Sequence, residues 1–238
     1  MPLEGRANDP DIRLAQGADQ LGLPLRAEDR ERLLAFLKLI AQWNRVYNLT
    51  ALKTPDEMFT HHLLDCLAVV LPLDRWLASA KASRQPQLLD VGTGAGLPGV
   101  VLAILRPNWN VTCIDAVAKK VSFIRQVSGE LGLPNLEAIH GRVENTGAWG
   151  ERRFDLIVSR AFASLADFVR LTRHVLACEA AWAAMKAQLT DEEIAAVPPD
   201  VEMFHVEHLS VPELEAQRRL VWLRPRMAGS RPTPEPRQ

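Results

Sequence analysis

The feature that most constrains the fold of this 238-residue chain is a glycine-rich turn between two apolar runs. The first run ends at Asp90 and Val91, alternating glycines follow at Gly92, Gly94 and Gly96, and apolar residues then resume. Glycine accepts positive φ angles and leaves the backbone bare, so a small ligand can lie directly against the N–H groups at the start of a helix. The stretch therefore predicts a strand, a ligand-binding turn and a helix.

From Gln87 onward, strand-like and helix-like segments alternate. Continuous apolar strands in such an alternation indicate a parallel sheet with helices on both faces. The last two strands are joined by a connection too short for a crossover helix, so we expect the last strand to be antiparallel. The predicted strands are Gln87–Val91, Asn110–Asp115, Leu136–His140, Phe154–Ser159, Ala180–Met185, Val201–Ser210 and Arg219–Leu223. The predicted helices between them are Leu97–Leu105, Ala118–Leu131, Arg142–Asn145, Phe162–Leu176 and Thr190–Ala196.

The residues before this sheet carry helical patterns and no strand signal. Apolar residues at helical spacing predict a helix over Glu28–Tyr47. Shorter helices are expected within residues 1–25 and at Pro55–His62, Leu63–Leu71 and Asp74 to about Ser83. We therefore divide the chain into an N-terminal helical segment (1–85), a sheet domain (86–223) and an Arg- and Pro-rich tail (224–238). The tail has little to bury and is expected to be disordered.

Composition excludes several classes of protein. No apolar run approaches the roughly 18 residues of a membrane span, and the charged N-terminus does not resemble a signal peptide. Cys66, Cys113 and Cys178 are isolated, which favours buried thiols over a disulfide or zinc framework. We therefore expect a cytoplasmic protein with no membrane partner and no metal. The net charge of −1 does not indicate nucleic acid, so such a partner would have to meet a local basic patch.

Acidic residues at the strand ends indicate which ligand the turn binds. The glycines match the dinucleotide pattern G-x-G-x-x-G, but Asp90 and Gly92-Thr93 separate them from the strand, which disfavours a nicotinamide cofactor. Asp90 can accept hydrogen bonds from the loop amides or face a cationic ligand group. Asp115 ends the second strand and can accept both ribose hydroxyls of an adenosine; the alternative is a helix cap. The Glu144 carboxylate can accept a hydrogen bond from the exocyclic amine of adenine. The alternative is that Glu144 simply begins a surface helix.

Other polar and aromatic residues have plainer interpretations. His61 and His62 precede an apolar helix, so we expect a capping or packing role. Trp43 and Tyr47 share a helix face and are expected in the core. The fourth strand ends without the Asn/Asp-Pro-Pro-aromatic tetrad of many amine methyltransferases. That absence favours a ring nitrogen as nucleophile, because its lone pair needs no general base.

In combination, several motifs resemble the small-subunit ribosomal RNA methyltransferase G family, also called glucose-inhibited division protein B. The resemblance covers about residues 30–223. It rests on Trp43-Asn44-Arg45-Val46-Tyr47-Asn48-Leu49-Thr50, His62-Leu63-Leu64-Asp65, the glycine turn, Ser159-Arg160-Ala161 and Met185-Lys186. Cys66 stands where the family commonly has serine, and Ala187 where glycine often follows the lysine.

This resemblance implies a class I S-adenosylmethionine-dependent methyltransferase: a Rossmann-like, seven-stranded, mostly parallel sheet whose last strand is antiparallel, preceded by an N-terminal helical extension. It implies methylation of guanine N7 in 16S rRNA (guanine 527 in the standard rRNA numbering). We expect a monomer that acts on 16S rRNA or the 30S subunit. By position, the family's cofactor contacts match Gly92, Leu97, Val143, Glu144 and Arg160, which join Asp90, Gly94, Gly96 and Asp115 from the reasoning above. Arg142 and Lys186 match basic residues that contact RNA or orient the guanine.

Three alternatives remain open at the level of sequence. A methyltransferase for a small metabolite or a protein would share the cofactor residues. An NAD-dependent oxidoreductase is disfavoured by Asp90 and by the antiparallel end of the sheet. A non-catalytic RNA-binding protein is disfavoured by the intact glycine turn and by Asp115.

Overall fold

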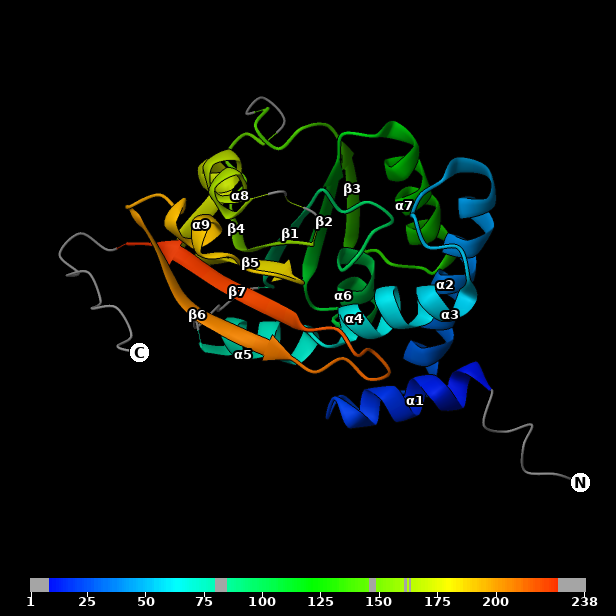
Figure 1. Ribbon diagram of the computed structural model, residues 1–238. Helices are drawn as coiled ribbons and strands as arrows, with labels where there is room; N and C mark the ends of the chain where they lie inside the picture. Colours follow the sequence, from blue (N-terminus) through cyan, green and yellow to red (C-terminus); the bar gives the residue numbers. More distant parts are fainter. Residues whose placement is uncertain (1–8, 80–84, 146–148, 161, 163, 227–238) are drawn as a thin grey trace, which may run out of the picture.

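A seven-stranded sheet forms the centre of the molecule in the computed structural model, which describes residues 9–79, 85–145, 149–160, 162 and 164–226. The strand order is β3-β2-β1-β4-β5-β7-β6 (Figure 1). The strands are β1 (Gln87–Val91), β2 (Asn110–Asp115), β3 (Leu136–His140), β4 (Phe154–Ser159), β5 (Leu176–Lys186), β6 (Val201–Leu209) and β7 (Arg218–Pro225).

Strand directions confirm the predicted mixed sheet. The strands β1 to β5 pair in parallel, and β7 pairs antiparallel with both β5 and β6. The strand order reverses between β1 and β4, because β2 and β3 extend the sheet on one side and β4 and β5 on the other. Ligands of open α/β sheets bind at such a reversal, outside the carboxyl ends of the strands.

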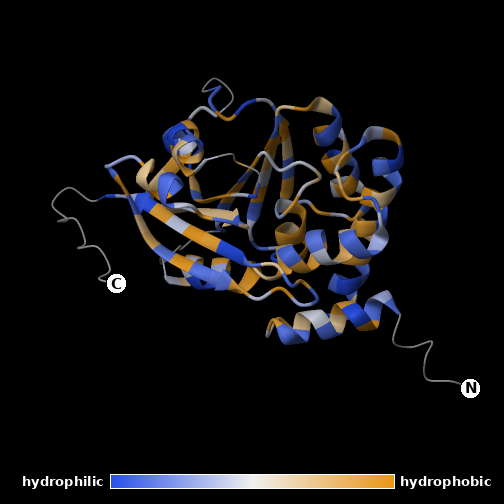
Figure 2. Cartoon of the chain, viewed as in Figure 1, coloured by the Kyte–Doolittle hydropathy of each residue, from blue (hydrophilic) through white to orange (hydrophobic). Residues whose placement is uncertain are grey.

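Helices cover both faces of the sheet. On one face lie α6 (Gly99–Leu105) and α7 (Ala118–Glu130) (Figure 1). On the other lies α8 (Leu165–Thr172), with α9 (Asp191–Ala195) beside it. The central strands are largely hydrophobic, whereas the helices carry polar residues outward (Figure 2). The sheet thus separates two apolar cores, as a parallel α/β architecture requires.

The N-terminal segment is a second helical layer on the α6 side. It consists of α1 (Pro10–Gln20), α2 (Ala27–Tyr47), α3 (Pro55–Met58), a π-helical turn (Phe59–Leu64), α4 (Asp65–Leu67) and α5 (Val70–Ser79). All seven residues of α6 are buried, because α2 packs on the helix from outside. Leu14, Phe36 and Leu64 belong to the same apolar cluster as Val100. The helices of this segment are therefore anchored to the sheet by a continuous core.

Two predicted helices need correction. Residues Arg142–Asn145 form a turn, closed by the Asn145 N–H donating to the Arg142 carbonyl (3.0 Å), and not a short helix. The helix expected over Phe162–Leu176 is shorter, since Ser164 caps α8 and a 3₁₀ turn (Arg173–Val175) follows. Strand β5 consequently begins at Leu176, four residues before the predicted start at Ala180.

Three smaller boundaries and exposures also differ. Helix α6 begins at Gly99, two residues later than expected, after a cis Leu97–Pro98 bond. Strand β7 continues through Arg224 to Pro225, so the tail predicted from 224 begins later, and residues 227–238 lie outside the described part. Cys178 is exposed, whereas the other two cysteines are buried as predicted. None of the described helices combines the length and apolarity that a bilayer crossing requires.

Candidate functional site

The glycine turn after β1 has the backbone that its sequence predicts. Gly92, Gly94 and Gly96 have φ angles of 66°, 60° and 84°. A Cβ added at Gly96 would lie 2.5 Å from Val100 Cγ2, so this glycine is also required for packing. Nothing lies within 4 Å of a Cβ added at Gly92 or Gly94. At these two positions the backbone is open, as a ligand-binding turn needs.

Asp90 supports the glycine turn through side-chain hydrogen bonds. Its side chain is fully buried, and Oδ2 accepts hydrogen bonds from Thr93 Oγ1 (2.6 Å) and the Gly99 N–H (2.8 Å). The predicted contact with loop amides is therefore present at Gly99. Burial raises the pKa of Asp90 from its ordinary value of 3.8 to about 6. Its Oδ1 is buried and has no hydrogen-bond partner among the described residues.

Gly99 is a site residue that our sequence analysis left out. A Cβ at this position would lie 2.3 Å from Cys113 Sγ and 2.9 Å from Asp90 Oδ2. Glycine is thus needed here for the close contact between α6, β1 and β2. The signal was available, because Gly99 is the last glycine of the G-x-G-x-x-G pattern.

Asp115 links the glycine turn to the loop after β2. Oδ2 accepts from the Gly94 N–H and Oδ1 from the Val117 N–H, both at 2.9 Å, and Lys120 Nζ lies 3.9 Å away. The N-cap of α7 is Val117, and it receives no side-chain cap. Asp115 therefore does not cap this helix. It orders two ligand-facing loops and remains at a cavity wall.

We call the cavity beside Asp115 the loop cavity. It has a volume of about 240 Å³ and lies across the ends of β1, β2 and β3. Five predicted site residues meet there: Gly92, Asp115, Arg142, Val143 and Glu144. Asp90 and Leu97 are buried and do not line it. Its full lining is Val91, Gly92, Ile114, Asp115, Ala116, Gly141, Arg142, Val143, Glu144, Phe162 and Leu171.

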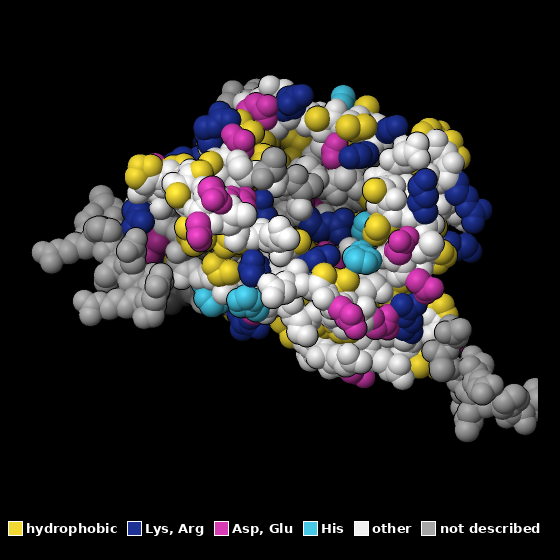
Figure 3. Space-filling model, in the orientation of Figure 1, with side chains coloured by type: hydrophobic (Ala, Val, Ile, Leu, Met, Phe, Trp, Pro, Cys, Tyr) yellow, Lys and Arg dark blue, Asp and Glu magenta, His cyan; other side chains and the backbone are white. Residues whose placement is uncertain are grey.

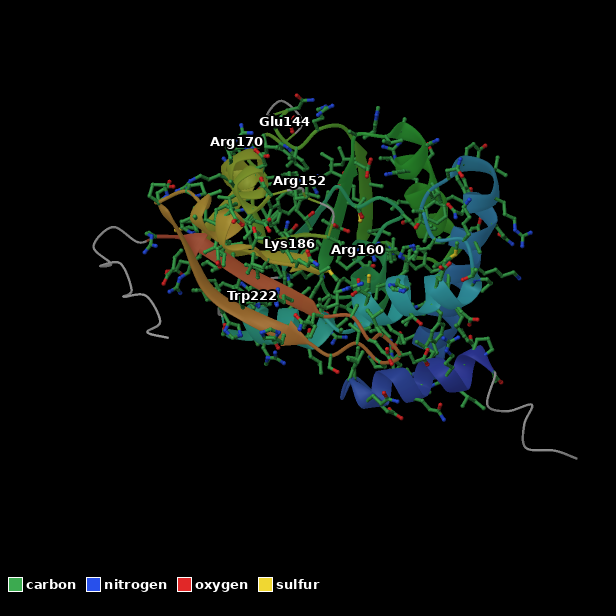
Figure 4. All side chains as sticks on the ribbon, viewed as in Figure 1. Glu144, Arg152, Arg160, Arg170, Lys186 and Trp222 are labelled. Atoms are coloured by element: carbon green, nitrogen blue, oxygen red, sulfur yellow. The ribbon has the colours of Figure 1, made fainter. Side chains whose placement is uncertain are left out.

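The turn after β3 supplies the outer wall of this cavity. Val143 is buried, and its carbonyl accepts from the buried Trp149 Nε1 at 2.9 Å. Glu144 and Arg142 are more exposed, with Arg142 NH1 lying 3.9 Å from Glu144 Oε1. Figure 4 shows Glu144 on this turn, away from Arg160 and Lys186. The wall thus combines an apolar side chain with a partly exposed carboxylate.

A second cavity, also of about 240 Å³, lies at the ends of β4, β5 and β7, and we call it the charged cavity. Arg160 follows β4, Lys186 ends β5 and Arg218 begins β7. Figure 4 shows Arg160 and Lys186 near each other in the middle of the molecule, and Figure 3 shows basic side chains gathered in that hollow. The structure therefore places the predicted cofactor residue Arg160 in this cavity. Its lining is His61, His62, Asp65, Arg160, Met185, Lys186, Ala187 and Arg218.

A hydrogen bond between Lys186 and Phe162 joins the two cavities. Lys186 Nζ donates to the Phe162 carbonyl (3.1 Å) and pairs with Glu193 Oε1 (2.6 Å). Phe162 lines the loop cavity, while Lys186 lines the charged cavity. The two cavities are therefore neighbours.

The N-terminal segment closes the charged cavity. Asp65 is buried; its Oδ1 accepts from Arg218 Nε at 3.0 Å, and Oδ2 lies 3.5 Å from Arg160 NH1. His62 is buried beside Arg160, and burial together with that guanidinium lowers its pKa from 6.5 to about 4. The sequence predicts a capping or packing role for His62 and does not single out Arg218. His62 and Asp65 did carry a signal, since residues three apart share a helix face.

The two aromatic residues that the sequence predicts in the core differ in their burial. Trp43 packs on Phe123, with ring centroids 5.3 Å apart, as expected for a core residue. Tyr47 is 43% exposed, so its predicted burial is wrong. Its ring lies tilted against that of Trp43 at the end of α2, with centroids 4.9 Å apart.

The loop cavity has the groups that an S-adenosyl ligand requires. Bare backbone at Gly92, the buried carboxylate of Asp115 at the cavity wall, the more exposed carboxylate of Glu144 and apolar Val143 suit a ribose and an adenine. The unpaired Oδ1 of Asp90 shows that the strand end can accept one further hydrogen bond. Among the described residues there is no group of three His, Cys, Asp or Glu side chains suited to a metal ion.

Solved structures show the same fold, and one of them holds S-adenosylmethionine. A variant of MtNAS in complex with S-adenosylmethionine is 15% identical, with a TM-score of 0.53 over 92% of this chain and 79% of that chain. TrmN from Thermus thermophilus is 18% identical, with a TM-score of 0.50 over 67% of this chain and 48% of that chain. With the site described above, the fold is that of a class I S-adenosylmethionine-dependent methyltransferase.

Sequence relatives define the family more closely. A family model described as rRNA small subunit methyltransferase G (GidB) matches residues 29–221. The protein of that name from Leptothrix cholodnii is 53% identical over 93% of this chain and 98% of its own length. The one from Methylibium petroleiphilum is also 53% identical, over 88% of this chain and 92% of its own length. The chain belongs to the rRNA small subunit methyltransferase G family, and the resemblance found in its motifs is confirmed.

Proposed function

We propose that this protein transfers the methyl group of S-adenosylmethionine to N7 of a guanine in 16S rRNA, at the position numbered 527 in standard rRNA numbering. Family membership supports the enzyme class and the ribosomal RNA substrate. The observation that carries the proposal is a pair of neighbouring cavities. One suits a nucleoside and the other is basic, and the hydrogen bond from Lys186 to Phe162 joins them.

We assign cofactor binding to residues of both cavities. Asp115 holds the ribose hydroxyls, Glu144 accepts from the adenine amine, and Val143 packs against the adenine ring. The backbone of Gly92, Gly94 and Gly96 lies against the ligand, with Asp90 and Leu97 fixing the turn. Arg160 suits the amino acid carboxylate, since a guanidinium pairs with carboxylates in a planar, bidentate geometry. When bound, the sulfonium supplies an electrophilic methyl group.

The charged cavity is proposed to receive the guanine. Lys186 can donate to guanine O6, a common contact of basic side chains with this base. N7 carries an available lone pair, so no residue has to remove a proton before the attack. The protein's contribution is then orientation and exclusion of water. Arg142, with a 72% exposed side chain, and the N-terminal helices are placed to contact RNA phosphates.

Labelled S-adenosylmethionine tests this function directly. The protein is incubated with 16S rRNA and with 30S subunits that lack the modification, and the labelled base is mapped. We expect label at guanine N7 in one of the two substrates, and a comparison of their rates shows whether naked RNA or the assembled subunit is used. Label at an exocyclic amine, or transfer to a metabolite or protein instead of RNA, would contradict the proposal.

We further propose that the enzyme acts in the cytoplasm as a monomer. Residues 1–85 would act with the sheet domain 86–223 as one rigid unit, since the core runs continuously through both. Sedimentation at micromolar concentration tests the monomer, and a single unfolding transition tests the rigid unit.

A further inference from the structure

His62 has no role in the reaction as proposed, yet it occupies a central position in the site. It is 5% exposed and lies on the π-helical turn Phe59–Leu64. Such turns are rare and occur frequently at functional sites. The imidazole lies between Thr50 of the N-terminal segment and Arg160, which follows β4.

The Arg160 guanidinium is surrounded by groups of the N-terminal segment. NH1 donates to the His61 carbonyl at 3.0 Å, and NH1 and NH2 each lie 3.4 Å from His62 Nδ1. Asp65 Oδ2 is 3.5 Å from NH1. The Arg160 side chain is 25% exposed, so one side is held by these groups while the other faces the charged cavity.

These contacts favour one tautomer of His62. Nδ1 lies 3.3 Å from the His61 carbonyl and 3.4 Å from both guanidinium nitrogens. That carbonyl already accepts from Arg160 NH1 at 3.0 Å, and a guanidinium can only donate hydrogen bonds, so we assign Nδ1 as the acceptor. The proton then resides on Nε2, which lies 2.8 Å from Thr50 Oγ1 and donates to it. Thr50 is itself fixed: its N–H donates to Asn44 Oδ1 (2.9 Å), and its hydroxyl oxygen accepts from the Leu52 N–H (3.3 Å). A chain of hydrogen bonds thus leads from α2 to Arg160.

The charges around His62 favour the same neutral state. Arg160 from β4, Lys186 from β5, Arg218 from β7 and the neighbouring His61 all line this cavity. Asp65 is the single carboxylate among the lining residues, and it is paired with Arg218 and Arg160. A protonated His62 would add a cation beside Arg160, which agrees with a pKa lowered to about 4.

We propose that His62 is a positioning residue that holds the Arg160 guanidinium toward the methyl-transfer site through its unprotonated Nδ1. The N-terminal helical segment thereby sets the geometry of the site as well as packing on the sheet. This inference rests on the proposed role of Arg160 in cofactor binding.

A double-mutant cycle tests the proposal with His62→Gln, Arg160→Gln and both together. We measure the Kd of S-adenosylhomocysteine by calorimetry and kcat/KM with the RNA substrate. Groups that act as one network couple strongly, so we expect His62→Gln to raise Kd about tenfold in the wild-type background and less than about twofold in the Arg160→Gln background. The same fold-change in both backgrounds would overturn the proposal. His208→Gln, an exposed histidine on β6, is the matched control and should change neither value.

His62→Asn separates positioning from packing. Asparagine keeps an acceptor near the position of Nδ1 but does not reach Thr50, whereas glutamine does the reverse. We expect the asparagine variant to retain tighter binding than the glutamine variant at equal folding, which circular dichroism checks. An asparagine variant as weak as the glutamine variant would overturn the acceptor role of Nδ1.

Two readouts separate this inference from the proposed function. The cofactor Kd requires no RNA, so an error about the guanine would leave the cycle intact. Nitrogen-15 spectra of the imidazole provide a spectroscopic test of the free protein. We expect an Nε2–H tautomer that persists from pH 7 down to pH 5; an Nδ1–H tautomer would overturn the proposal.

Discussion

The two cavities at the carboxyl edge of the sheet have equal volumes but different origins. The loop cavity is made from backbone and carboxylates of the turns that follow β1, β2 and β3. The charged cavity is made from long side chains of β4, β5, β7 and the N-terminal segment. The first is therefore fixed by local chain geometry, and the second by ion pairs between distant segments, such as Arg218 with Asp65.

This difference has a consequence for function. Bare backbone and two carboxylates recognise one invariant nucleoside ligand, and rigid turns are well suited to that task. A cavity of cationic side chains suits a polyanionic partner whose approach is steered by charge. Substitutions should consequently separate into those that damage the turns and those that change only the charge.

The largest expected effect is a loss of stability in Gly99→Ala, at the start of α6 behind the glycine turn. The added Cβ would lie 2.3 Å from the buried Cys113 Sγ and 2.9 Å from Asp90 Oδ2. Overpacking of this kind costs about 1–3 kcal/mol, and we expect the upper end together with weakened cofactor binding. Urea unfolding measures it. The control is Gly129→Ala in α7, where nothing lies within 4 Å of the new Cβ and a gain of about 0.5 kcal/mol is expected. Equal stabilities of the two variants would refute the packing role of Gly99.

The next effect is a pH dependence with opposite signs in the two cavities. The folded-state pKa of Asp90 is raised to about 6, so its contribution to stability is fully present below pH 3.8 and is lost as pH rises through 6. The folded-state pKa of His62 is lowered to about 4, so its contribution is present above pH 6.5 and is lost as pH falls through 4. The two slopes oppose each other between pH 4 and 6.

Replacing either titratable group should reveal the pH dependence of unfolding free energy that the other contributes. In Asp90→Asn the free energy of unfolding should rise with pH between 4 and 6 more steeply than in the wild type, by a difference on the order of 1 kcal/mol per pH unit. In His62→Asn the difference should have the opposite sign. Urea unfolding at closely spaced pH values measures both, and parallel curves for the three proteins would contradict the assignment.

The smallest effect is expected from Arg142→Ala at the rim of the loop cavity. Its side chain is exposed, and among the described residues it pairs only with Glu144, at 3.9 Å, so stability should change by less than about 0.5 kcal/mol. RNA affinity should fall modestly, and the slope of log affinity against log salt should decrease by about 1 if one phosphate contact is lost. Filter binding over a salt series measures this, and an unchanged slope would remove Arg142 from the RNA interface.

The sequence predicts the loop cavity better than the charged cavity for a physical reason. Glycines and strand ends within 88–144 report on their own backbone, so the glycine turn and the strands β1, β2 and β3 have the predicted bounds. His62 and Arg160 are 98 positions apart, and Asp65 and Arg218 are 153 apart. No local periodicity reports such contacts, and they become visible only after the chain has folded.

The errors in secondary structure arise from tertiary contacts. The turn at Arg142–Asn145 is held by the Trp149 indole, which donates to the Val143 carbonyl. Trp149 lies outside the four residues from which the short helix was predicted. The early end of α8 coincides with Thr172, whose hydroxyl donates to the Phe168 carbonyl and accepts from Trp182 of β5. In both places a buried tryptophan N–H has its acceptor where the predicted helix was wrong.

The central claim is that the loop cavity binds the nucleoside of the methyl donor, while the charged cavity receives the base and holds the donor's carboxylate at Arg160. The most direct measurement is the Kd of S-adenosylhomocysteine alongside kcat/KM for RNA methylation in Asp115→Asn and Lys186→Gln. We expect Asp115→Asn to raise Kd at least about tenfold, because hydrogen bonds to a charged group contribute about 1.5–3 kcal/mol. Lys186→Gln should leave Kd within about twofold and lower kcat/KM by a similar factor of ten or more. Equal losses of cofactor affinity in both variants would contradict the division into two cavities.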